Sequence, residues 1–310
     1  MKKIFITLAA VILSAGLVSA QDMAKATETA QTANEAFQSG DKSLALTGFK
    51  EALTLASACG EDGAELVSQC KNGVAQVMLS LAKDSIKGNE FDSAISQLKE
   101  TIATATEYGI DEVVSEATTL IPQVFMTKGT NLLKEKNFAG AAEAYKAVLD
   151  SDPENGNAAL RLGQALMGAG KAEDAIAAFE QAAKNGQEET AKKQISNIYL
   201  KQAAGALKTK AYAGAVENAL KANEYGDNAQ AFLIAGQASQ QLSKNADAIK
   251  YFEKYLELAP TAKNSNAIAF TVAALYQKAG NKAKATEFYT KVQNDPQLGA
   301  QAKQQLGALK

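Results

Sequence analysis

The stretch of sequence that decides the fold runs from residue 122 to residue 189. It consists of PQVFMTKGTNLLKEKNFAGAAEAYKAVLDSDPEN (122–155), followed directly by GNAALRLGQALMGAGKAEDAIAAFEQAAKNGQEE (156–189). The two segments match at a spacing of 34 residues, so that Gly129 corresponds to Gly163 and Tyr145 to Phe179. Self-similarity at such a period indicates a repeat architecture, in which each unit buries its apolar face against its neighbours.

Each segment has a small residue, an alanine twelve positions later, and a large apolar residue four positions after that alanine. Residues four apart share one face of a helix. Small side chains where two helices cross let the backbones approach, and the large residue fills the space between units. The pattern resembles the tetratricopeptide repeat (TPR), a pair of helices that stacks into a solenoid.

The same pattern recurs seven times along the chain, and Ala219 is the one position of the large residue that is small. The small residues of the first helices are Ala33, Ala82, Gly129, Gly163, Ala203, Gly236 and Ala273. The alanines of the second helices are Ala45, Ala94, Ala141, Ala175, Ala215, Ala248 and Ala285, and the residues four later are Phe49, Leu98, Tyr145, Phe179, Ala219, Phe252 and Tyr289.

The resemblance implies an all-α fold, a right-handed α-solenoid of about seven TPR-like helix pairs, with a different helical repeat as the alternative. The first units are longer, because residues 55–79 align without gaps onto residues 102–126. We expect the added residues to extend the start of each first helix, and Pro122 to bend one of them. The predicted domains are elongated repeats over 21–121, repeats of near-standard length over 122–297 and a capping helix over 298–310.

Glycine and proline mark the turns. Gly40, Gly170 and Gly280 occupy one position of the unit, after the first helix, where a glycine with positive φ ends a helix well. The Asp152–Pro153 pair is predicted to be the N-cap and the first residue of the next helix.

Residues 1–20 have the pattern of a secretory leader. Lys2 and Lys3 precede the apolar run 4–18, and small residues follow up to Ala20. The run is shorter than the roughly 20 residues that span a bilayer, so a retained anchor is the weaker alternative. We therefore predict an exported protein of the periplasm or cell envelope, cut before Gln21 and without an integral membrane segment afterwards.

The composition excludes several kinds of function. The 310 residues include no histidine, which excludes Ser-His and Cys-His catalytic pairs and ordinary histidine metal sites. Two of the 32 basic residues lie in the leader, so the mature chain is mildly acidic, and its one arginine is Arg161. This balance argues against a nucleic-acid partner. The sequence predicts no catalytic residue, no cofactor and no metal.

Cys59 and Cys70 form a candidate disulfide, because an exported protein meets an oxidising environment. The repeat itself does not require cysteine, since Thr106 and Ala117 occupy the matching positions of the aligned segment. Two buried free thiols, or a redox or metal role, remain alternatives.

The resemblance places the first helices along a concave face, where extended peptides bind. Amides there can bond an extended backbone, and lysines can bind a carboxylate; the alternative is that these are solvated helix faces. The candidate partner-binding residues are Gln123, Thr130, Lys134, Asn157, Gln164, Asn197, Lys201, Lys208, Gln230, Gln237, Gln240, Gln241, Gln277 and Lys278, with Leu160 among them.

The sequence therefore predicts a non-enzymatic scaffold or adaptor with a protein or peptide partner. One alternative is a carbohydrate- or peptidoglycan-binding module, which would need Tyr108, Tyr199, Tyr212 and Tyr225 exposed on one face. Another is an enzyme or the non-catalytic subunit of an envelope enzyme complex. The residues do not identify the partner.

Overall fold

The computed structural model describes residues 17–309, with the side chains of residues 21–309. All of the regular structure in these residues is helical, and none of them forms a strand. The predicted all-α class is confirmed. The predicted leader lies outside the described side chains, so its assignment stays a prediction. Across the described residues, no helix combines the length and the apolarity that crossing a bilayer requires.

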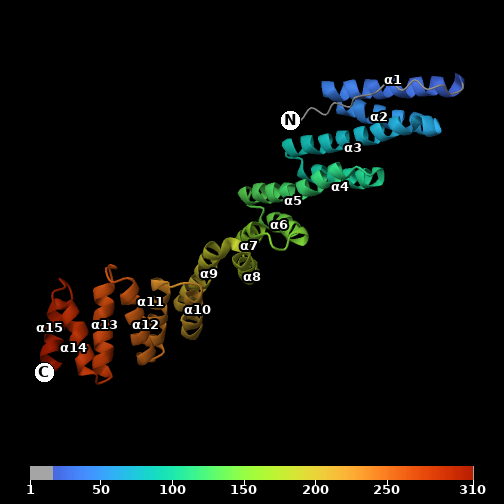
Figure 1. The fold of residues 1–310 in the computed structure, drawn as a ribbon. Coiled ribbons are helices and arrows are strands. Elements are labelled where there is room, and N and C mark those ends of the chain that lie inside the picture. Colours follow the sequence, from blue (N-terminus) through green and yellow to red (C-terminus); the bar gives the residue numbers. More distant parts are fainter. Residues whose placement is uncertain (1–16, 310) are drawn as a thin grey trace. The chain divides into compact units, whose positions relative to one another are not determined.

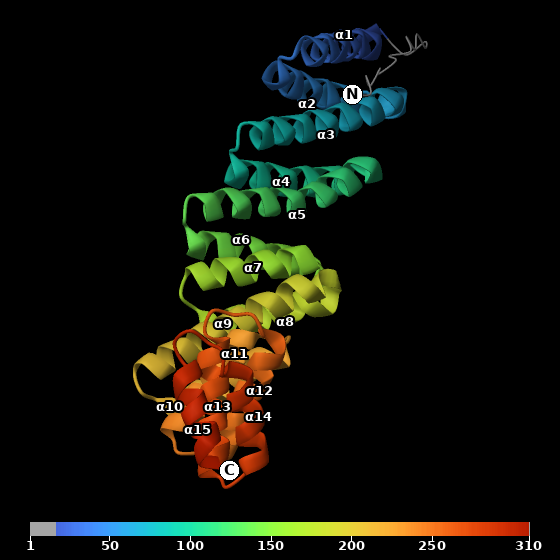
Figure 2. The ribbon, with the colours of Figure 1, turned by 90° about the vertical axis from the view of Figure 1, so that its left-hand side faces the viewer.

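The helices group into two compact units, the first ending at Pro153 and the second beginning at Glu154. Within unit 1, each helix packs against the next one along the chain (Figures 1 and 2). Its helices are α1 (Leu17–Ser39), α2 (Lys42–Ala58), the 3₁₀ turn η1 (Gly60–Gly63), α3 (Ala64–Lys87), α4 (Phe91–Tyr108), α5 (Asp111–Lys134) and α6 (Phe138–Ser151).

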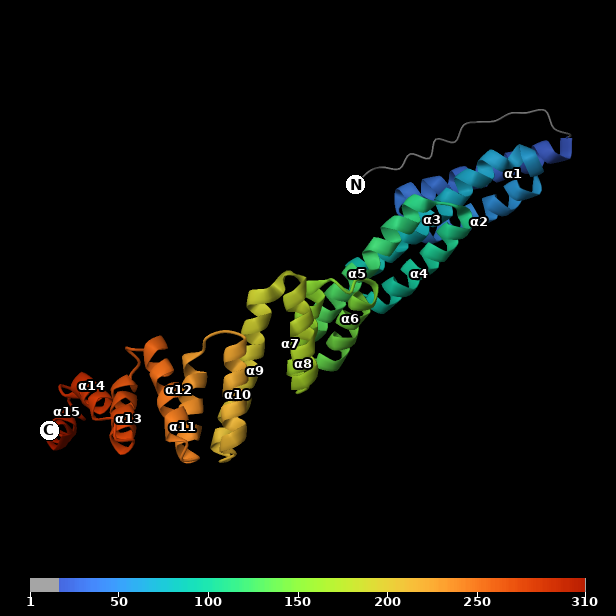
Figure 3. The ribbon, with the colours of Figure 1, turned by 60° about the horizontal axis from the view of Figure 1, so that its bottom comes forward.

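Unit 2 repeats this arrangement with helices that are shorter except for α9, and they lie side by side in chain order (Figure 3). Its helices are α7 (Gly156–Gly168), α8 (Ala172–Ala182), the π-helical segment η2 (Ala183–Gln187), α9 (Glu188–Lys208), α10 (Tyr212–Glu224), α11 (Ala229–Gln241), α12 (Asn245–Leu258), α13 (Ser265–Lys278), α14 (Lys282–Val292) and α15 (Gly299–Leu309).

The seven predicted helix pairs are confirmed. Each predicted small residue lies on a first helix (α1, α3, α5, α7, α9, α11, α13), and its partner alanine lies on the helix that follows. All fourteen of these positions are buried, and so are the seven residues one turn after the alanines. Three pairs lie in unit 1 and four in unit 2, followed by α15 where the capping helix was predicted.

Glycine at the helix crossing is required by the ring that covers it. A Cβ atom on Gly163 would lie 2.5 Å from the ring of Phe179, and one on Gly236 would lie 2.5 Å from the ring of Phe252. Both rings are buried, so neither can move aside cheaply. The contact that the sequence pattern predicted, small residue against large residue, is therefore present in the pairs of Gly129 with Tyr145, Gly163 with Phe179 and Gly236 with Phe252.

The turn after the first helix has a left-handed residue in all seven pairs. Gly40, Gly170 and Gly280 have φ of 95°, 76° and 77°, which confirms the glycine prediction. At the same position, seven residues after the small residue, the other pairs hold Asn89, Lys136, Lys210 and Ser243, with φ of 60–62°. The tight turn is therefore a property of the repeat rather than of glycine.

Two local predictions were wrong. Asn155, not Asp152, caps α7, because its side chain accepts a hydrogen bond from the Ala158 N–H at 3.0 Å. The added length in unit 1 does not extend the first helices alone. It lengthens α2 and α4 as well, because the buried positions continue past Phe49 to Ala52 and Ala56.

The predicted domain boundary between residues 121 and 122 falls inside α5, which continues through Pro122. That boundary rests on repeat length, whereas the division after Pro153 rests on compactness. The domain assignment and the bend at Pro122 stay predictions.

Candidate partner-binding face

The first helices of unit 2 differ from the second helices in charge. α7, α11 and α13 contain no acidic residue, and the acidic residues of α9, Glu188 and Glu189, lie in its first turn. The second helices carry the other helical carboxylates of this unit, which are Glu173, Asp174, Glu180, Glu217, Glu224, Asp247, Glu253, Glu257 and Glu287. The acidic residues of this unit are therefore concentrated on the second helices, and the cations of the first helices are concentrated on α9.

Helical spacing brings most of the predicted residues of α9 and α11 onto one face of each helix. On α9, Asn197, Lys201 and Lys208 are separated by four and seven residues, and all three are exposed. On α11, Gln230, Gln237 and Gln241 have the same seven- and four-residue separations. We call this surface the first-helix face of unit 2; its residues are Asn157, Leu160, Gln164, Asn197, Lys201, Lys208, Gln230, Gln237, Gln240, Gln241, Gln277 and Lys278.

Most of these side chains are accessible. Asn157, Asn197, Lys201, Lys208, Gln230, Gln240, Gln241 and Lys278 are exposed, whereas Leu160, Gln164, Gln237 and Gln277 are half-buried. Gln164 accepts a hydrogen bond from the Arg161 guanidinium at 3.2 Å. In the described part of the chain, no hydrogen bond engages the side chains of Gln237, Gln240 or Gln241. These amides are available to a partner's backbone.

Gln277 has a structural task. Its side-chain oxygen accepts a hydrogen bond from the Tyr289 hydroxyl at 2.8 Å, and its amide nitrogen donates to Gln305 of α15 at 3.1 Å. Gln277 thus ties α13 to the capping helix, and a partner would have to displace that contact to reach it.

The three remaining predicted residues lie on α5, in unit 1. Gln123 and Lys134 are exposed. Thr130 is half-buried and satisfied internally, since its hydroxyl bonds the Met126 carbonyl at 2.8 Å and lies 3.2 Å from the Tyr145 hydroxyl. We therefore treat the α5 residues apart from the first-helix face of unit 2.

The four tyrosines that a sugar-binding reading needs are all half-buried. Tyr199 and Tyr225 stack on each other with ring centroids 6.1 Å apart, and the Tyr225 hydroxyl donates to Glu180 at 2.8 Å. Burial and this bond raise the pKa of Tyr225 to about 12. Tyr108 lies in unit 1, beneath the Lys71 ammonium. These rings are engaged in packing, so the condition set for the sugar-binding alternative is not met.

Cys59 and Cys70 are free thiols in the structure. Cys59 ends α2 and is half-buried, and its Sγ lies 3.4 Å from the Leu55 carbonyl oxygen. Cys70 is buried in α3, and burial raises the pKa of its thiol to about 11. Their pairing stays a prediction. Among the described residues, no group of three or more acidic or thiol side chains is placed to hold a metal ion.

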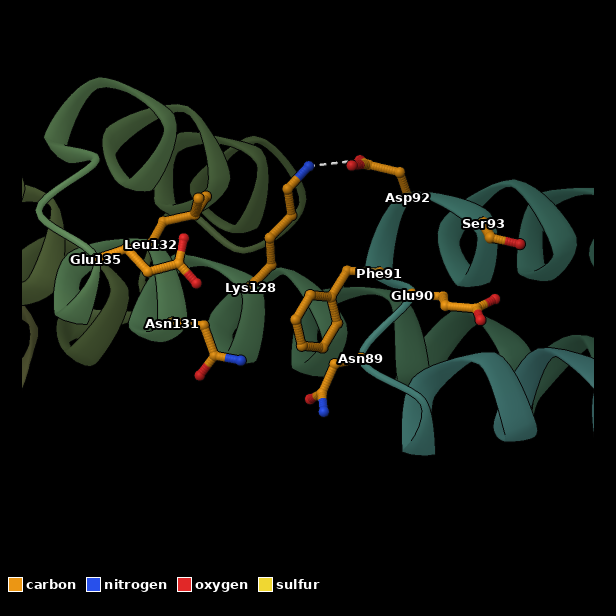
Figure 4. Close-up of a pocket in the computed structure, with 9 residues that line it drawn as sticks. All are labelled: Asn89, Glu90, Phe91, Asp92, Ser93, Lys128, Asn131, Leu132 and Glu135. Carbon is orange, nitrogen blue, oxygen red and sulfur yellow. Dashed lines mark hydrogen bonds and ion pairs between the residues drawn. The ribbon is translucent and has the colours of Figure 1, made fainter.

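Sequence reasoning missed a pocket in unit 1, between the α3–α4 turn and α5. Its volume is about 380 Å³, and Phe91 and the Lys128–Asp92 ion pair lie in it (Figure 4). The sequence carries no clear signal for it, because the equivalents of Lys128 and Asn131 are apolar in α7, α11 and α13 but polar in α1, where they are Thr32 and Glu35.

Comparison with known proteins settles the nature of the repeats. The tetratricopeptide-repeat family model matches residues 126–189 and 205–263. These two segments contain tetratricopeptide repeats. Since TPR proteins generally act as non-catalytic scaffolds with many different clients, protein partners are the expectation for this chain.

Solved structures of MamA are also similar to the chain. The crystal structure of MamA protein is 20% identical, with a TM-score of 0.35 over 58% of this chain and 94% of that one. A MamA fragment from Desulfovibrio magneticus is 17% identical, with a TM-score of 0.32 over 55% of this chain and 92% of that one. No curated protein matches the chain at a significant level.

Proposed function

We propose that this TPR chain is a non-enzymatic adaptor of the periplasm or cell envelope, which binds an acidic, extended segment of a partner protein on the first-helix face of unit 2. The observation that carries the proposal is the segregation of charge between first and second helices. Cations such as Lys201 and Lys208 attract carboxylates, and the absence of acidic residues from α7, α11 and α13 removes competing repulsion.

The amides supply the second part of the recognition. An extended segment presents backbone N–H and C=O groups at regular intervals, and a glutamine side chain can bond both. Gln237 and Gln241 lie one turn apart on α11. Because α7 and α11 pack against the buried rings of Phe179 and Phe252, their part of the face is ordered before binding, which lowers the entropic cost of capture.

The test is partner capture with matched charge variants. The tagged protein is expressed in its native host, cross-linked in the intact envelope and purified, and the captured proteins are identified by mass spectrometry. Lys201→Glu/Lys208→Glu should reduce recovery of the specific partner at least tenfold. The control, Lys250→Glu/Lys282→Glu, changes the net charge of the protein by the same amount. Its substitutions lie on the second helices α12 and α14, so it should leave recovery unchanged.

Two outcomes would overturn the proposal. One is equal loss with both double variants, which would mean that net charge rather than this face governs capture. The other is a captured segment without carboxylates. The location is tested separately by the intact mass of the protein from the periplasmic fraction, which should begin at Gln21; a chain that keeps residue 1 and stays in the cytoplasm would contradict export.

A further inference from the structure

Unit 1 contains a pocket that shares no residue with the first-helix face of unit 2. It lies between the turn that joins α3 to α4 and the second half of α5, and its volume is about 380 Å³. Figure 4 shows the Phe91 ring inside it, with Asn131 on one side of the ring and Glu90 on the other. The lining residues are Asn89, Glu90, Phe91, Asp92, Ser93, Lys128, Asn131, Leu132 and Glu135.

Two residues of α5 that line the pocket occupy positions that are apolar and buried in α7, α11 and α13. Lys128 precedes the small residue Gly129 by one position, and Asn131 follows it by two. In α7 the same two positions are Leu162 and Ala165, both buried. In α11 they are Ala235 and Ala238, and in α13 Val272 and Leu275, and all four are buried. Other first helices also have polar side chains there, at Thr32 and Glu35 of α1, Asp84 of α3 and Gln202 of α9. On α5 such side chains lie beside Phe91 and line the pocket.

The pocket has an excess of negative charge. Three carboxylates line it, those of Glu90, Asp92 and Glu135, against the single ammonium of Lys128. Lys128 is paired with Asp92. The carboxylates of Glu90 and Glu135 form no ion pair with a described lysine. Lys87, Lys134 and Lys136 flank the pocket in sequence, but none of them lines it.

We propose that this pocket receives an arginine side chain of a partner protein. A guanidinium stacks on an aromatic ring and donates five hydrogen bonds in its plane. Phe91 offers the ring, Glu90 and Glu135 offer the charge, and Asn89 and Asn131 offer amide oxygens. The inference goes beyond the adaptor function, because it assigns a second site, of opposite charge preference, in unit 1.

The experiment titrates the full-length mature chain with three capped heptapeptides. They consist of glycine and serine around one central arginine, one central lysine or one central citrulline, which has the shape of arginine without its charge. Nuclear magnetic resonance follows the backbone amides of residues 89–93 and 128–135. The arginine peptide should shift these signals, and the titration should give a millimolar dissociation constant. It should bind more tightly than the lysine peptide and at least fivefold more tightly than the citrulline peptide.

Matched variants locate the charge. Glu90→Gln/Glu135→Gln keeps the shape of the pocket and should weaken the arginine peptide at least about fivefold. Glu51→Gln/Glu112→Gln removes two exposed carboxylates of α2 and α5 outside the pocket and should change the affinity less than twofold. Circular dichroism melting checks that each variant is folded, and Phe91→Leu should weaken binding by removing the ring alone.

The proposal is overturned if citrulline binds as well as arginine, if lysine binds more tightly than arginine, or if both double variants lose affinity equally. Lys201→Glu/Lys208→Glu, in unit 2, should leave the arginine peptide unaffected. A result that contradicts the arginine-pocket proposal can therefore be distinguished from one that contradicts the adaptor proposal.

Discussion

At the scale of single residues, the turn of the repeat shows how a backbone requirement is met by different side chains. Seven equivalent positions have positive φ, and glycine occupies three of them. The other four positions hold Asn89, Lys136, Lys210 and Ser243, although a left-handed conformation costs a residue with a Cβ atom about 1–2 kcal/mol. Glycine at one of these four positions should therefore stabilise the protein without any change in packing.

Replacing Ser243, which has φ of 60°, by glycine should raise the free energy of unfolding by about 0.5–1 kcal/mol. The relief of left-handed strain exceeds the entropy that glycine adds to the unfolded chain. Chemical denaturation with an unchanged m-value is the measurement. The control is Ala103→Gly at an exposed interior position of α4, which should lose about 1 kcal/mol. A loss of stability in both variants would show that Ser243 is not left-handed in solution.

These turns also mark where sequence reasoning ends. Gly40, Gly170 and Gly280 could be assigned from residue type, because glycine after a helix signals positive φ. Lys136 and Lys210 could not, since lysine has no such preference, and only their register within the repeat identifies them. Asp152–Pro153 misled the N-cap assignment because Asp152 and Asn155 both have side chains that can cap a helix, and the one used is Asn155.

Cys70 gives a prediction of pH dependence. Burial raises its thiol pKa from 9.0 to about 11, so the folded state favours the neutral thiol. This contribution to stability is complete below pH 9 and is lost as the pH rises toward 11. We expect the unfolding free energy of both proteins, measured in reductant, to fall between pH 9 and pH 11. The fall should be about 2–3 kcal/mol smaller in Cys70→Ala than in the parent. Tyrosine and lysine titrations are common to both proteins and cancel. Parallel pH profiles would contradict a buried, reduced Cys70.

At the scale of helices, α9 and α10 form the pair that departs from the pattern. Ala219 stands where other pairs hold a large residue, and it is fully buried. Its surroundings are mostly alanine, with the partly buried rings of Tyr199, Tyr212 and Tyr251 packed against them. Those rings, rather than a residue at position 219, fill the space beside the pair.

Restoring the motif with Ala219→Phe should therefore destabilise the protein, by about 1–3 kcal/mol, because the site is already packed. Adding Ala203→Gly should recover part of the loss, since glycine at that position accommodates the ring in the Gly163–Phe179 and Gly236–Phe252 pairs. Chemical denaturation of the two single variants and the double variant gives the coupling free energy between positions 203 and 219. A stabilising Ala219→Phe would mean that the cluster holds unfilled space.

Helix pairing could be predicted from the sequence, whereas helix length could not. The constant offset between a small residue and an alanine is enforced by the crossing of two helices, so it survives in all seven pairs. The extra residues of unit 1 carry no such constraint, and they could have lengthened either neighbour. The structure divides them between α2 and α3 and between α4 and α5, because Ala52, Ala56, Thr101 and Ala105 continue the buried face.

At the scale of the whole molecule, the candidate sites differ in how far they could be predicted from the sequence. The first-helix face of unit 2 was predicted as a set of amides and lysines, because the repeat assigns those positions to the surface. The separation of charge between first and second helices needed the observed helix boundaries. The pocket of unit 1 needed side chains placed around Phe91, since nothing in a single polar residue such as Asn131 indicates open space.

The capping helix α15 closes the last repeat. Ala302 is buried in the cluster that holds Tyr289 and Val292, and Leu306 and Leu309 pack against that cluster. An array of stacked pairs exposes an apolar end unless something covers it. The bond from Gln277 to Gln305 adds a polar contact at 3.1 Å, so the cap is held by apolar burial with an amide pair at its edge.

A chain that stops at Leu298 should therefore lose about 2–3 kcal/mol of unfolding free energy, since burial of two half-covered leucines and one alanine is removed. It should also self-associate, because the exposed end of α13 and α14 is apolar. Denaturation and sedimentation velocity measure the two effects. Gln305→Ala removes the amide pair alone and should cost no more than about 1 kcal/mol with no association. If both changes cost the same, the apolar contacts of α15 contribute little, and the array ends instead with α14 as a self-sufficient outer helix.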